Sequence, residues 1–595
     1  MLDFKLNTGS DSRVKSSISI FVLLWALALL QGCASTSPAV EEGISPVKDA
    51  EPVHPLPKTR PRPENYPAAS FEDDALYQLL VAEVAGYRGQ YDTALEKYVE
   101  VTIQSRDPGV AARATRLASY LKRYPEALQV AQIWAEEDPD NLDAHRHAAD
   151  QLMKVGDLEG AILHMEAIKR LGGFANFDVF AYRAANLDDD SRAVLLDAIS
   201  RMLEDYAQDE QLRFSKAVLL EQSGRLEEAL ALANVLLEHK KNINVIILKV
   251  NALRDLNRTE EAVEFLDDAL AELPDNRRLH LIYARFLFEA NRLDAARTQY
   301  EWVLDRSPND GDVLFALALI SMEQKKDESA KEYLNKMIRW NRRASEAHFY
   351  LGSLAEKDKD YPVAIRQYKQ VGIGYEFLPA QARIASMMID QGRLKEAREY
   401  LETIRAENPG RYQQLIMVEA QLLSERGLEK EVFSLLDEAL TVNADSIELL
   451  YFRAMTGEKF DRMDILERDL RKIITLEPNN ADALNALGYS LTDKTNRHEE
   501  ALVLIEKALA IKPNEAAFID SMGWVLYRLK KLEEAVKFLR QALDMFPNDE
   551  VAAHLGEVLW RLGEKLEAGR VWEKALELKP NSEFLNRVVN RFRSQ

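Results

Sequence analysis

The chain has 595 residues, 47% of them hydrophobic and 29% charged, and its formal net charge is −21. Such an acidic chain would repel nucleic-acid phosphates, and no run of five or more Lys or Arg forms a local basic patch, so no nucleic-acid partner is expected. A single cysteine, Cys33, excludes internal disulfides.

The first 32 residues have the pattern of a signal peptide. Lys5, Arg13 and Lys15 form a positive region, and the apolar run of residues 18–30 is short for a membrane span. The four residues that end at Cys33, Leu-Gln-Gly-Cys, resemble a bacterial lipobox, in which the cysteine is lipidated and becomes the first residue of the mature chain. An ordinary secretory signal with a chance cysteine is the alternative.

The lipobox resemblance implies a membrane anchor. Three acyl chains on Cys33, palmitate among them, would hold the protein lastingly, at roughly 0.8 kcal/mol per buried CH₂. Ala34 follows, and it is not the aspartate that retains lipoproteins at the inner membrane. We therefore expect an outer-membrane anchor, with the protein facing the periplasm.

Residues 33–70 form a proline-rich tether that we expect to be disordered. Few apolar residues separate its prolines, so the segment cannot bury enough surface to fold. A simple spacer is one interpretation, and a proline-rich ligand for another domain is the alternative. The prolines are Pro38, Pro46, Pro52, Pro55, Pro57, Pro61, Pro63 and Pro67.

Residues 71–580 repeat with a period near 34. The pattern is clearest near the C-terminus, where a glycine, an alanine and a proline recur at fixed spacing. Two antiparallel helices take about 34 residues, small residues allow their backbones to approach, and proline ends the second helix. The three sets are Gly488, Gly523 and Gly556; Ala501, Ala535 and Ala568; Pro513, Pro547 and Pro580.

The same register runs back to the start of the array. Most equivalent positions hold alanine, while those at Leu195, Val432 and Leu466 are degenerate and could mark kinks or hinges. The earlier equivalents are Ala94, Ala127, Ala161, Leu195, Ala229, Ala262, Ala296, Ala330, Ala364, Ala397, Val432 and Leu466.

These residues resemble the tetratricopeptide repeat pattern. The resemblance implies an all-α fold, a right-handed superhelical solenoid of about fifteen helix pairs. After the array, residues 581–595 read as an amphipathic capping helix that closes the exposed end. Its apolar side is predicted to carry Phe584, Leu585, Val588, Val589 and Phe592.

Nothing in the sequence indicates catalysis, a metal or a cofactor. The hydrolase, metalloprotease, redox and phosphate-loop motifs are missing. His145 and His147 point to different sides of a helix, and His145 and His348 hold packing positions. Acidic pairs such as Glu227-Glu228 read as solvated starts of second helices. We expect no enzyme, and no small-molecule substrate.

Binding is therefore expected on the surface of the array. By the resemblance, the first helix of each pair lines a concave groove, and in the last three repeats its inward positions hold aromatic residues. Aromatic and arginine side chains are enriched at binding hot spots. Burial of these rings by tight superhelical winding is the alternative. The predicted partner-binding residues are Tyr489, Trp524, Tyr527 and Trp560, with Arg528 and Arg561 beside them.

The whole layout resembles large outer-membrane tetratricopeptide lipoproteins of Gram-negative bacteria, in particular adaptors of a periplasmic carboxyl-terminal processing protease. The resemblance implies a scaffold that brings the protease to peptidoglycan hydrolases. One alternative is a scaffold of an exopolysaccharide-export or envelope-assembly complex. An alternative of another class is a cell-wall-polymer hydrolase that uses groove carboxylates.

Overall fold

The computed structural model describes residues 73–173, 177–239 and 241–593. Within these ranges every regular element is a helix: thirty-one α-helices, α2 to α32, and two short 3₁₀-helices. Along the chain they make fifteen successive pairs and one last helix, which confirms the predicted all-α repeat fold. Both Cys33 and the tether of residues 33–70 lie outside the described residues.

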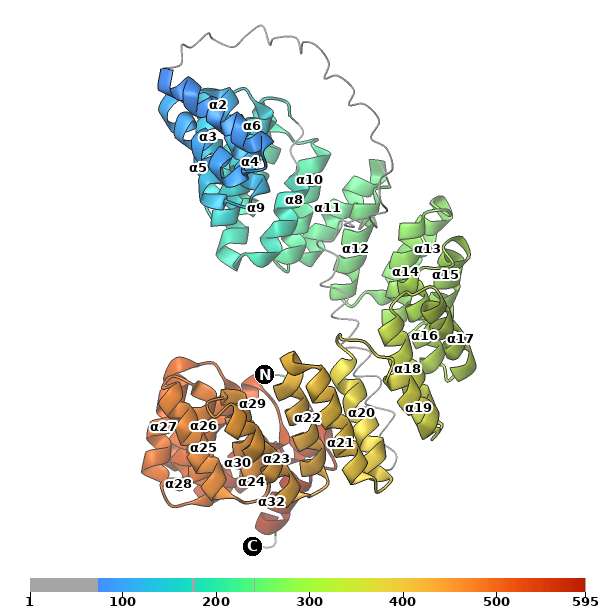
Figure 1. Cartoon of the computed structure of the whole chain (residues 1–595), viewed down its shortest axis with the longest axis vertical. Helices are drawn as coiled ribbons and strands as arrows, with labels where there is room; N and C mark the ends of the chain where they lie inside the picture. The colour runs from blue at the N-terminus through green and yellow to red at the C-terminus, as the bar shows by residue number, and fades with distance from the viewer. Residues whose placement is uncertain (1–72, 174–176, 240, 594–595) are drawn as a thin grey trace. The chain divides into compact units, whose positions relative to one another are not determined.

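The helices fall into two compact units, and successive helices within each unit lie side by side (Figure 1). The first unit holds α2 to α16. Its helices are α2 (Asp73–Tyr87), α3 (Tyr91–Ser105), α4 (Pro108–Tyr120), α5 (Tyr124–Glu137), α6 (Leu142–Val155), α7 (Leu158–Arg170), α8 (Phe177–Arg183), η2 (Ala184–Asn186), α9 (Asp189–Asp205), α10 (Glu210–Gln222), α11 (Leu226–His239), α12 (Ile243–Asp255), α13 (Thr259–Glu272), α14 (Arg277–Glu289), α15 (Leu293–Arg306) and α16 (Gly311–Glu323).

The second unit holds α17 to α32. Its helices are α17 (Asp327–Arg339), α18 (Ala344–Lys357), α19 (Tyr361–Tyr368), α20 (Phe377–Asp390), α21 (Leu394–Glu407), η3 (Pro409–Arg411), α22 (Tyr412–Glu425), α23 (Glu429–Val442), α24 (Ile447–Lys459), α25 (Met463–Leu476), α26 (Ala481–Lys494), α27 (His498–Ile511), α28 (Ala516–Arg528), α29 (Leu532–Met545), α30 (Asp549–Leu562), α31 (Lys565–Leu578) and α32 (Glu583–Arg593).

Small residues sit where paired helices touch, as the sequence predicts. All fifteen positions of the alanine register are at most 2% exposed, including Leu195, Val432 and Leu466. A Cβ atom placed on Gly488 would lie 2.6 Å from Ile505 Cγ1, and one on Gly523 would lie 2.5 Å from Leu539 Cγ. Glycine is therefore needed there because the second helix of the pair fills the space that any side chain would occupy.

The helix ends follow the local sequence. α27, α29 and α31 each stop two residues before the predicted proline. Side-chain caps begin two of the first helices here, α26 and α30: Asn480 accepts a hydrogen bond from the backbone N–H of Ala483, and Asn548 from that of Val551. Such caps satisfy backbone donors that the helix itself leaves free.

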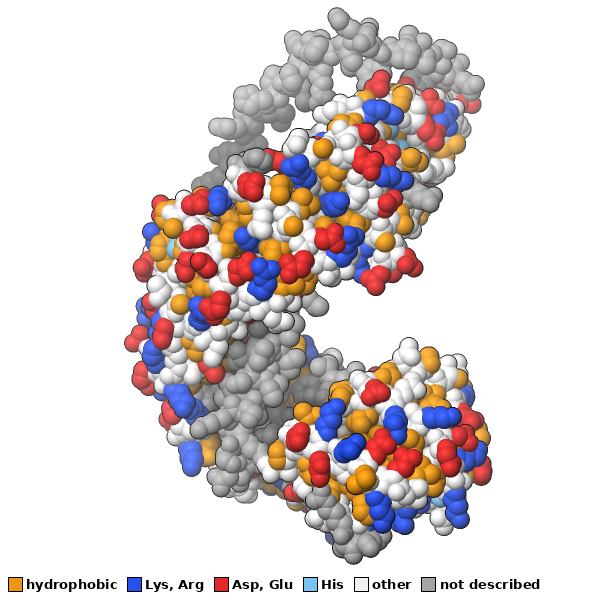
Figure 2. Space-filling view, turned by 180° about the vertical axis from the view of Figure 1, so that it is seen from behind, with side chains coloured by type: hydrophobic (Ala, Val, Ile, Leu, Met, Phe, Trp, Pro, Cys, Tyr) orange, Lys and Arg blue, Asp and Glu red, His pale blue; other side chains and the backbone are white. Residues whose placement is uncertain are grey.

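Ion pairs join neighbouring repeats over the surface. Glu227, at the start of one second helix, lies 3.2 Å from Arg258, which precedes the next second helix. Glu467, one turn into α25, likewise lies 2.9 Å from Arg497, which precedes α27. Opposite charges are accordingly interspersed over the visible face (Figure 2). The acidic pairs predicted to be solvated helix starts thus also contact the following repeat, although each exposed pair contributes little stability.

The last helix, α32, covers the end of the array. It packs on α30, and Leu585, Val588, Val589 and Phe592 are buried. Phe584 was predicted on the same side, but it is 40% exposed and makes only an edge contact with the ring of His554. Among the helices that the structure describes, none has both the length and the apolar character to span a membrane.

Candidate protein-binding surfaces

The aromatic residues predicted to bind partners lie on three successive first helices of the second unit. Tyr489 is on α26, Trp524 and Tyr527 are on α28, and Trp560 is on α30. They do not form an open lane. Instead, each ring or its hydroxyl contacts another helix at this end of the array, as the following contacts show.

Trp524 is buried, with 7% of its surface exposed. Its indole stacks on the ring of His554, with centroids 4.1 Å apart and planes at 20°. The ring of Tyr527 lies 5.0 Å away on the same helix. The surface predicted for Trp524 is thus almost fully taken by α30, which agrees with the alternative that winding buries the ring. Partner binding by this set stays a prediction, and Trp524 contributes little exposed area to it.

Tyrosine hydroxyls tie the same three helices together. Tyr489 donates a hydrogen bond to Glu550 on α30 over 2.9 Å, and Tyr527 donates to Glu557 over 2.9 Å. Burial raises the pKa of both phenols, and the neighbouring carboxylates raise it further. Both hydroxyls therefore stay protonated donors at neutral pH, and two of the groove carboxylates are already bonded.

A buried charge pair lies behind these tyrosines. Nδ1 of His554 is 3.0 Å from each carboxylate oxygen of Asp520, and both residues are less than 9% exposed. Burial alone would lower the pKa of His554, but the charge and the hydrogen bond of Asp520 outweigh it, so the pKa is raised. Opposite charge on the partner is what makes burial of this imidazolium tolerable.

Trp560 packs toward the end of the array. Its ring stacks on Trp572 at 5.7 Å and lies 6.0 Å from Phe592 of α32. Arg561 is exposed and holds its guanidinium 5.2 Å from the Phe592 ring, while Arg528 is half-buried and donates to the backbone oxygen of Asp493 at 3.4 Å. The accessible parts of the predicted set are therefore Arg561 and the half-buried edges of the tyrosines, Trp560 and Arg528.

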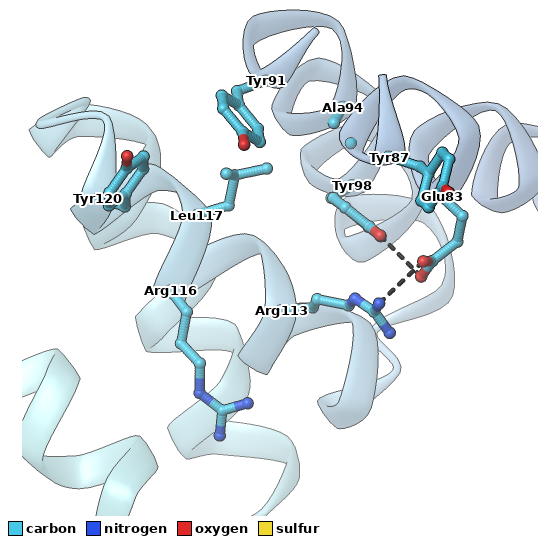
Figure 3. A pocket seen from close by; sticks show the side chains of 10 residues that line it. Glu83, Tyr87, Tyr91, Ala94, Tyr98, Arg113, Arg116, Leu117 and Tyr120 are labelled. Carbon is cyan, nitrogen blue, oxygen red and sulfur yellow. Dashed lines mark hydrogen bonds and ion pairs between the residues drawn. The ribbon is translucent and has the colours of Figure 1, made fainter. Parts of the chain in front are cut away.

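A second candidate surface lies at the other end of the array, between α2, α3 and α4 (Figure 3). We call it the tyrosine pocket. It has a volume of about 520 Å³. Its lining residues are Glu83, Gly86, Tyr87, Tyr91, Ala94, Tyr98, Arg113, Arg116, Leu117 and Tyr120.

Glu83 lines one side of the tyrosine pocket. Its carboxylate accepts hydrogen bonds from the hydroxyl of Tyr98 and from Nη2 of Arg113, both over 2.8 Å (Figure 3). Burial, with the hydrogen bond to Glu83, raises the pKa of Tyr98 to about 12. This side of the pocket thus presents the neutral phenol of Tyr98 beside the ion pair of Glu83 and Arg113.

The rim of the tyrosine pocket is exposed. Tyr87 is 96% exposed, Tyr120 73% and Tyr91 43%. The rings of Tyr91 and Tyr120 meet edge to face with centroids 6.1 Å apart. Sequence reasoning missed this pocket because it followed only the inward groove positions. The one available signal was the presence of five tyrosines within the first three helices of the array.

The histidines and carboxylates form no metal centre among the described residues. His145 bonds through Nδ1 to His164 at 2.8 Å and through Nε2 to the backbone oxygen of Pro139 at 2.9 Å. His348 bonds to Gln367 at 2.8 Å. His145 is buried, as its predicted packing position requires, while His348 is half-buried.

Comparison with known proteins agrees with the helix pairs. Tetratricopeptide repeat family models match residues 253–301, 284–341, 481–515 and 521–583. The chain is 41% identical, over 548 residues, to the TPR repeat-containing protein PA4667 of Pseudomonas aeruginosa, and the match covers 92% of each chain. It is 32% identical over 126 residues to the type IV pilus assembly protein PilF of the same species, covering 20% of this chain and 48% of PilF.

Among solved structures, Naa15/Naa10 bound to HypK-THB matches with a TM-score of 0.41 at 12% identity, covering 88% of this chain and 96% of that chain. The match to the Pseudomonas relative extends over nearly the whole of both sequences. The chain belongs to the tetratricopeptide repeat proteins.

Proposed function

We propose that this protein is a non-enzymatic adaptor, held at the outer membrane by a lipid on Cys33, that gathers periplasmic proteins. Tetratricopeptide repeat proteins bind other proteins, and this chain carries fifteen helix pairs for that purpose. The most plausible cargo is a carboxyl-terminal processing protease together with its peptidoglycan hydrolase substrates.

One observation carries the proposal: aromatic and arginine side chains remain accessible at two separate places in the array. The tyrosine pocket is formed by α2, α3 and α4, and the aromatic cluster by α26, α28 and α30. A protein that holds two ligands at once raises the local concentration of each for the other. This is how an adaptor accelerates proteolysis without chemistry of its own.

The groove carboxylates support an adaptor better than a hydrolase. Asp520 is paired with His554, Glu550 accepts from Tyr489, and Glu557 accepts from Tyr527 and from Arg591. A glycosidase requires two carboxylates free to face one bond and its attacking water. The purified chain should therefore leave peptidoglycan intact. Turnover that disappears with Asp520→Asn would favour the enzyme instead.

A second candidate is a scaffold for envelope assembly, such as exopolysaccharide export. The similarity to a pilus assembly protein favours it, although the match covers only 20% of this chain. Affinity capture from solubilised envelopes, followed by mass spectrometry, separates the candidates. A serine protease recovered with wall hydrolases supports the adaptor, whereas synthase, export or pilus subunits support the assembly scaffold.

The two surfaces can be tested in the same capture. Tyr87→Ala with Tyr120→Ala should remove one partner, and Trp560→Ala with Arg561→Ala the other. Tyr375→Ala is the matched control, because Tyr375 is 76% exposed and lies outside both surfaces. Equal recovery of every partner from all three variants would remove the two-surface proposal.

The anchor is tested separately. Radioactive fatty acid should label the wild-type chain in cells and should not label Cys33→Ser, and the labelled chain should fractionate with outer membranes. Unlabelled wild type, or label retained by Cys33→Ser, would contradict the lipid anchor while leaving the adaptor proposal open.

A further inference from the structure

The rim of the tyrosine pocket has the chemistry that recognises proline-rich chains. Tyr87, Tyr91 and Tyr120 present exposed rings from three different helices, and Leu117 adds an apolar wall (Figure 3). Aromatic-lined grooves bind the polyproline II helix because that helix is already extended and loses little entropy on binding. The rings also offer large rigid contact area with a hydroxyl at the edge.

An apolar stripe leads along α2 to this pocket. Leu76, Leu80 and Val84 are 54%, 58% and 49% exposed, and with Tyr87 they follow the helical spacing of one face. Among the described residues α2 is the first helix, and no other described element covers this stripe. At the other end of the array α32 provides that cover. The stripe thus marks a path from the start of α2 to the tyrosine pocket that another segment can cover.

The chain itself supplies a fitting segment directly before α2. Residues 52–67 contain six prolines, and apolar side chains at Val53, Leu56 and Tyr66 lie between them. Pro52 and Pro55 are three residues apart, the spacing that places two prolines on one side of a polyproline II helix. The six prolines are Pro52, Pro55, Pro57, Pro61, Pro63 and Pro67.

The distances allow this segment to fold back. Gly86 in the pocket lies thirteen residues beyond Asp73, which is roughly 20 Å along α2 at 1.5 Å per residue. Ten residues separate Pro63 from Asp73, which is roughly 31 Å of extended chain at 3.1 Å per residue. The connection is therefore long enough for Pro63 and its neighbours to reach the rim.

We propose that the tyrosine pocket binds the proline-rich segment of residues 52–67 of the same chain. A short connection gives the segment a high effective concentration at the pocket, so weak contacts suffice to hold it. The segment would then compete with any partner that the array binds at this pocket.

Photo-crosslinking within the full chain tests the proposal. Tyr87→p-benzoylphenylalanine keeps an aromatic ring at the most exposed rim position, and mass spectrometry identifies what it links. Isotope-labelled and unlabelled chains are mixed before irradiation, so that links within one chain are told apart from links between chains. We expect links to residues 52–67 within one chain.

Three further variants carry the same photoreactive residue. Tyr120→Ser should lower the link yield about tenfold, the effect of about 1.4 kcal/mol lost in binding. Tyr375→Ser, an equally exposed tyrosine elsewhere, should leave it unchanged. Serine at all six prolines should also lower the yield, and it changes no residue of the described helices.

The proposal is overturned by links that form between chains, which would indicate a second copy, or by links to another protein. It is equally overturned if no link to residues 52–67 forms. A yield that stays unchanged with all six prolines replaced would show that the segment is merely near the pocket, and would overturn the proposal as well.

Discussion

The last three repeats and the repeat before them close their helix pairs in different ways. In α26, α28 and α30 an apolar residue precedes the glycine: Leu487, Met522 and Leu555. In α24 the equivalent position holds Arg453, followed by Ala454. Its guanidinium bonds Asp469 on α25 through two nitrogens, over 2.6 and 2.9 Å. In the last three repeats the two helices of a pair are held by close apolar packing, whereas α24 and α25 are joined by a buried ion pair.

The difference teaches what the repeat actually requires. Asp469 is 1% exposed, and Arg453 is 9% exposed. Desolvating two charges costs several kcal/mol per ion, which good geometry roughly offsets. The bidentate contact and a further bond from Arg453 to Asp437 provide that geometry. The two-helix module therefore requires that the interface be filled at this position. Either an apolar side chain or a buried ion pair can fill it.

The largest expected effect comes from breaking the ion pair on one side. Asp469→Leu leaves Arg453 buried with only the more exposed Asp437 beside it, so we expect a loss of about 3–5 kcal/mol. Hydrogen exchange of peptides from α24 and α25 measures it, since a long repeat array does not unfold as a single two-state unit. Protection in those two helices should fall while α30 and α31 keep theirs.

The double variant Arg453→Leu with Asp469→Leu rebuilds the apolar closure of the later repeats. It removes both charges, so most of the lost protection should return. A double variant that is as poorly protected as the single one would show that the ion pair does more than fill the interface.

A smaller effect tests closure by shape. A Cβ atom on Gly556 would overlap Nε1 of Trp572, a rigid ring that is fully buried, so Gly556→Ala should cost about 1–3 kcal/mol. Gly569 is the matched control, because a Cβ atom there meets no atom within 4 Å. Gly569→Ala should stabilise α31 by about 0.5–1 kcal/mol through helix propensity. Exchange changes of the same sign in both variants would contradict closure by shape.

Most of the fold could be predicted because it depends on local spacing. A two-helix module repeats its small residues every 34 positions, and positions such as Ala501 and Ala535 are buried as that register requires. The ion pair could not be predicted, because Arg453 and Asp469 lie sixteen residues apart and on buried helix faces, where charged residues are rare.

Less of the site could be predicted, because it depends on how repeats wind on one another. The register places Trp524 on an inward face, but only the stacking of α30 on α28 brings His554 onto its ring. The tyrosine pocket could not be predicted for a related reason. Tyr91 and Tyr120 meet only because α3 and α4 belong to consecutive pairs, and neither residue holds a groove position.

The smallest expected effect concerns pH and compares the two buried charge pairs directly. The pKa of His554 is raised in the folded chain because Asp520, and less strongly Glu550 and Glu557, favour the imidazolium. Its stabilising contribution is therefore complete below the unfolded value of about 6.5 and is lost as pH rises through the folded value. Arg453 stays charged throughout, so its pair with Asp469 should not respond.

One exchange experiment at pH 6 and pH 9, corrected for intrinsic exchange rates, reads both pairs in the same sample. Protection of α28 and α30 should be lower at pH 9, and that of α24 and α25 should be equal at the two values. His554→Gln should abolish the pH response of α28 and α30, because glutamine does not titrate. A response that persists in His554→Gln would assign it to other groups, and an equal response in α24 would remove the distinction between the two pairs.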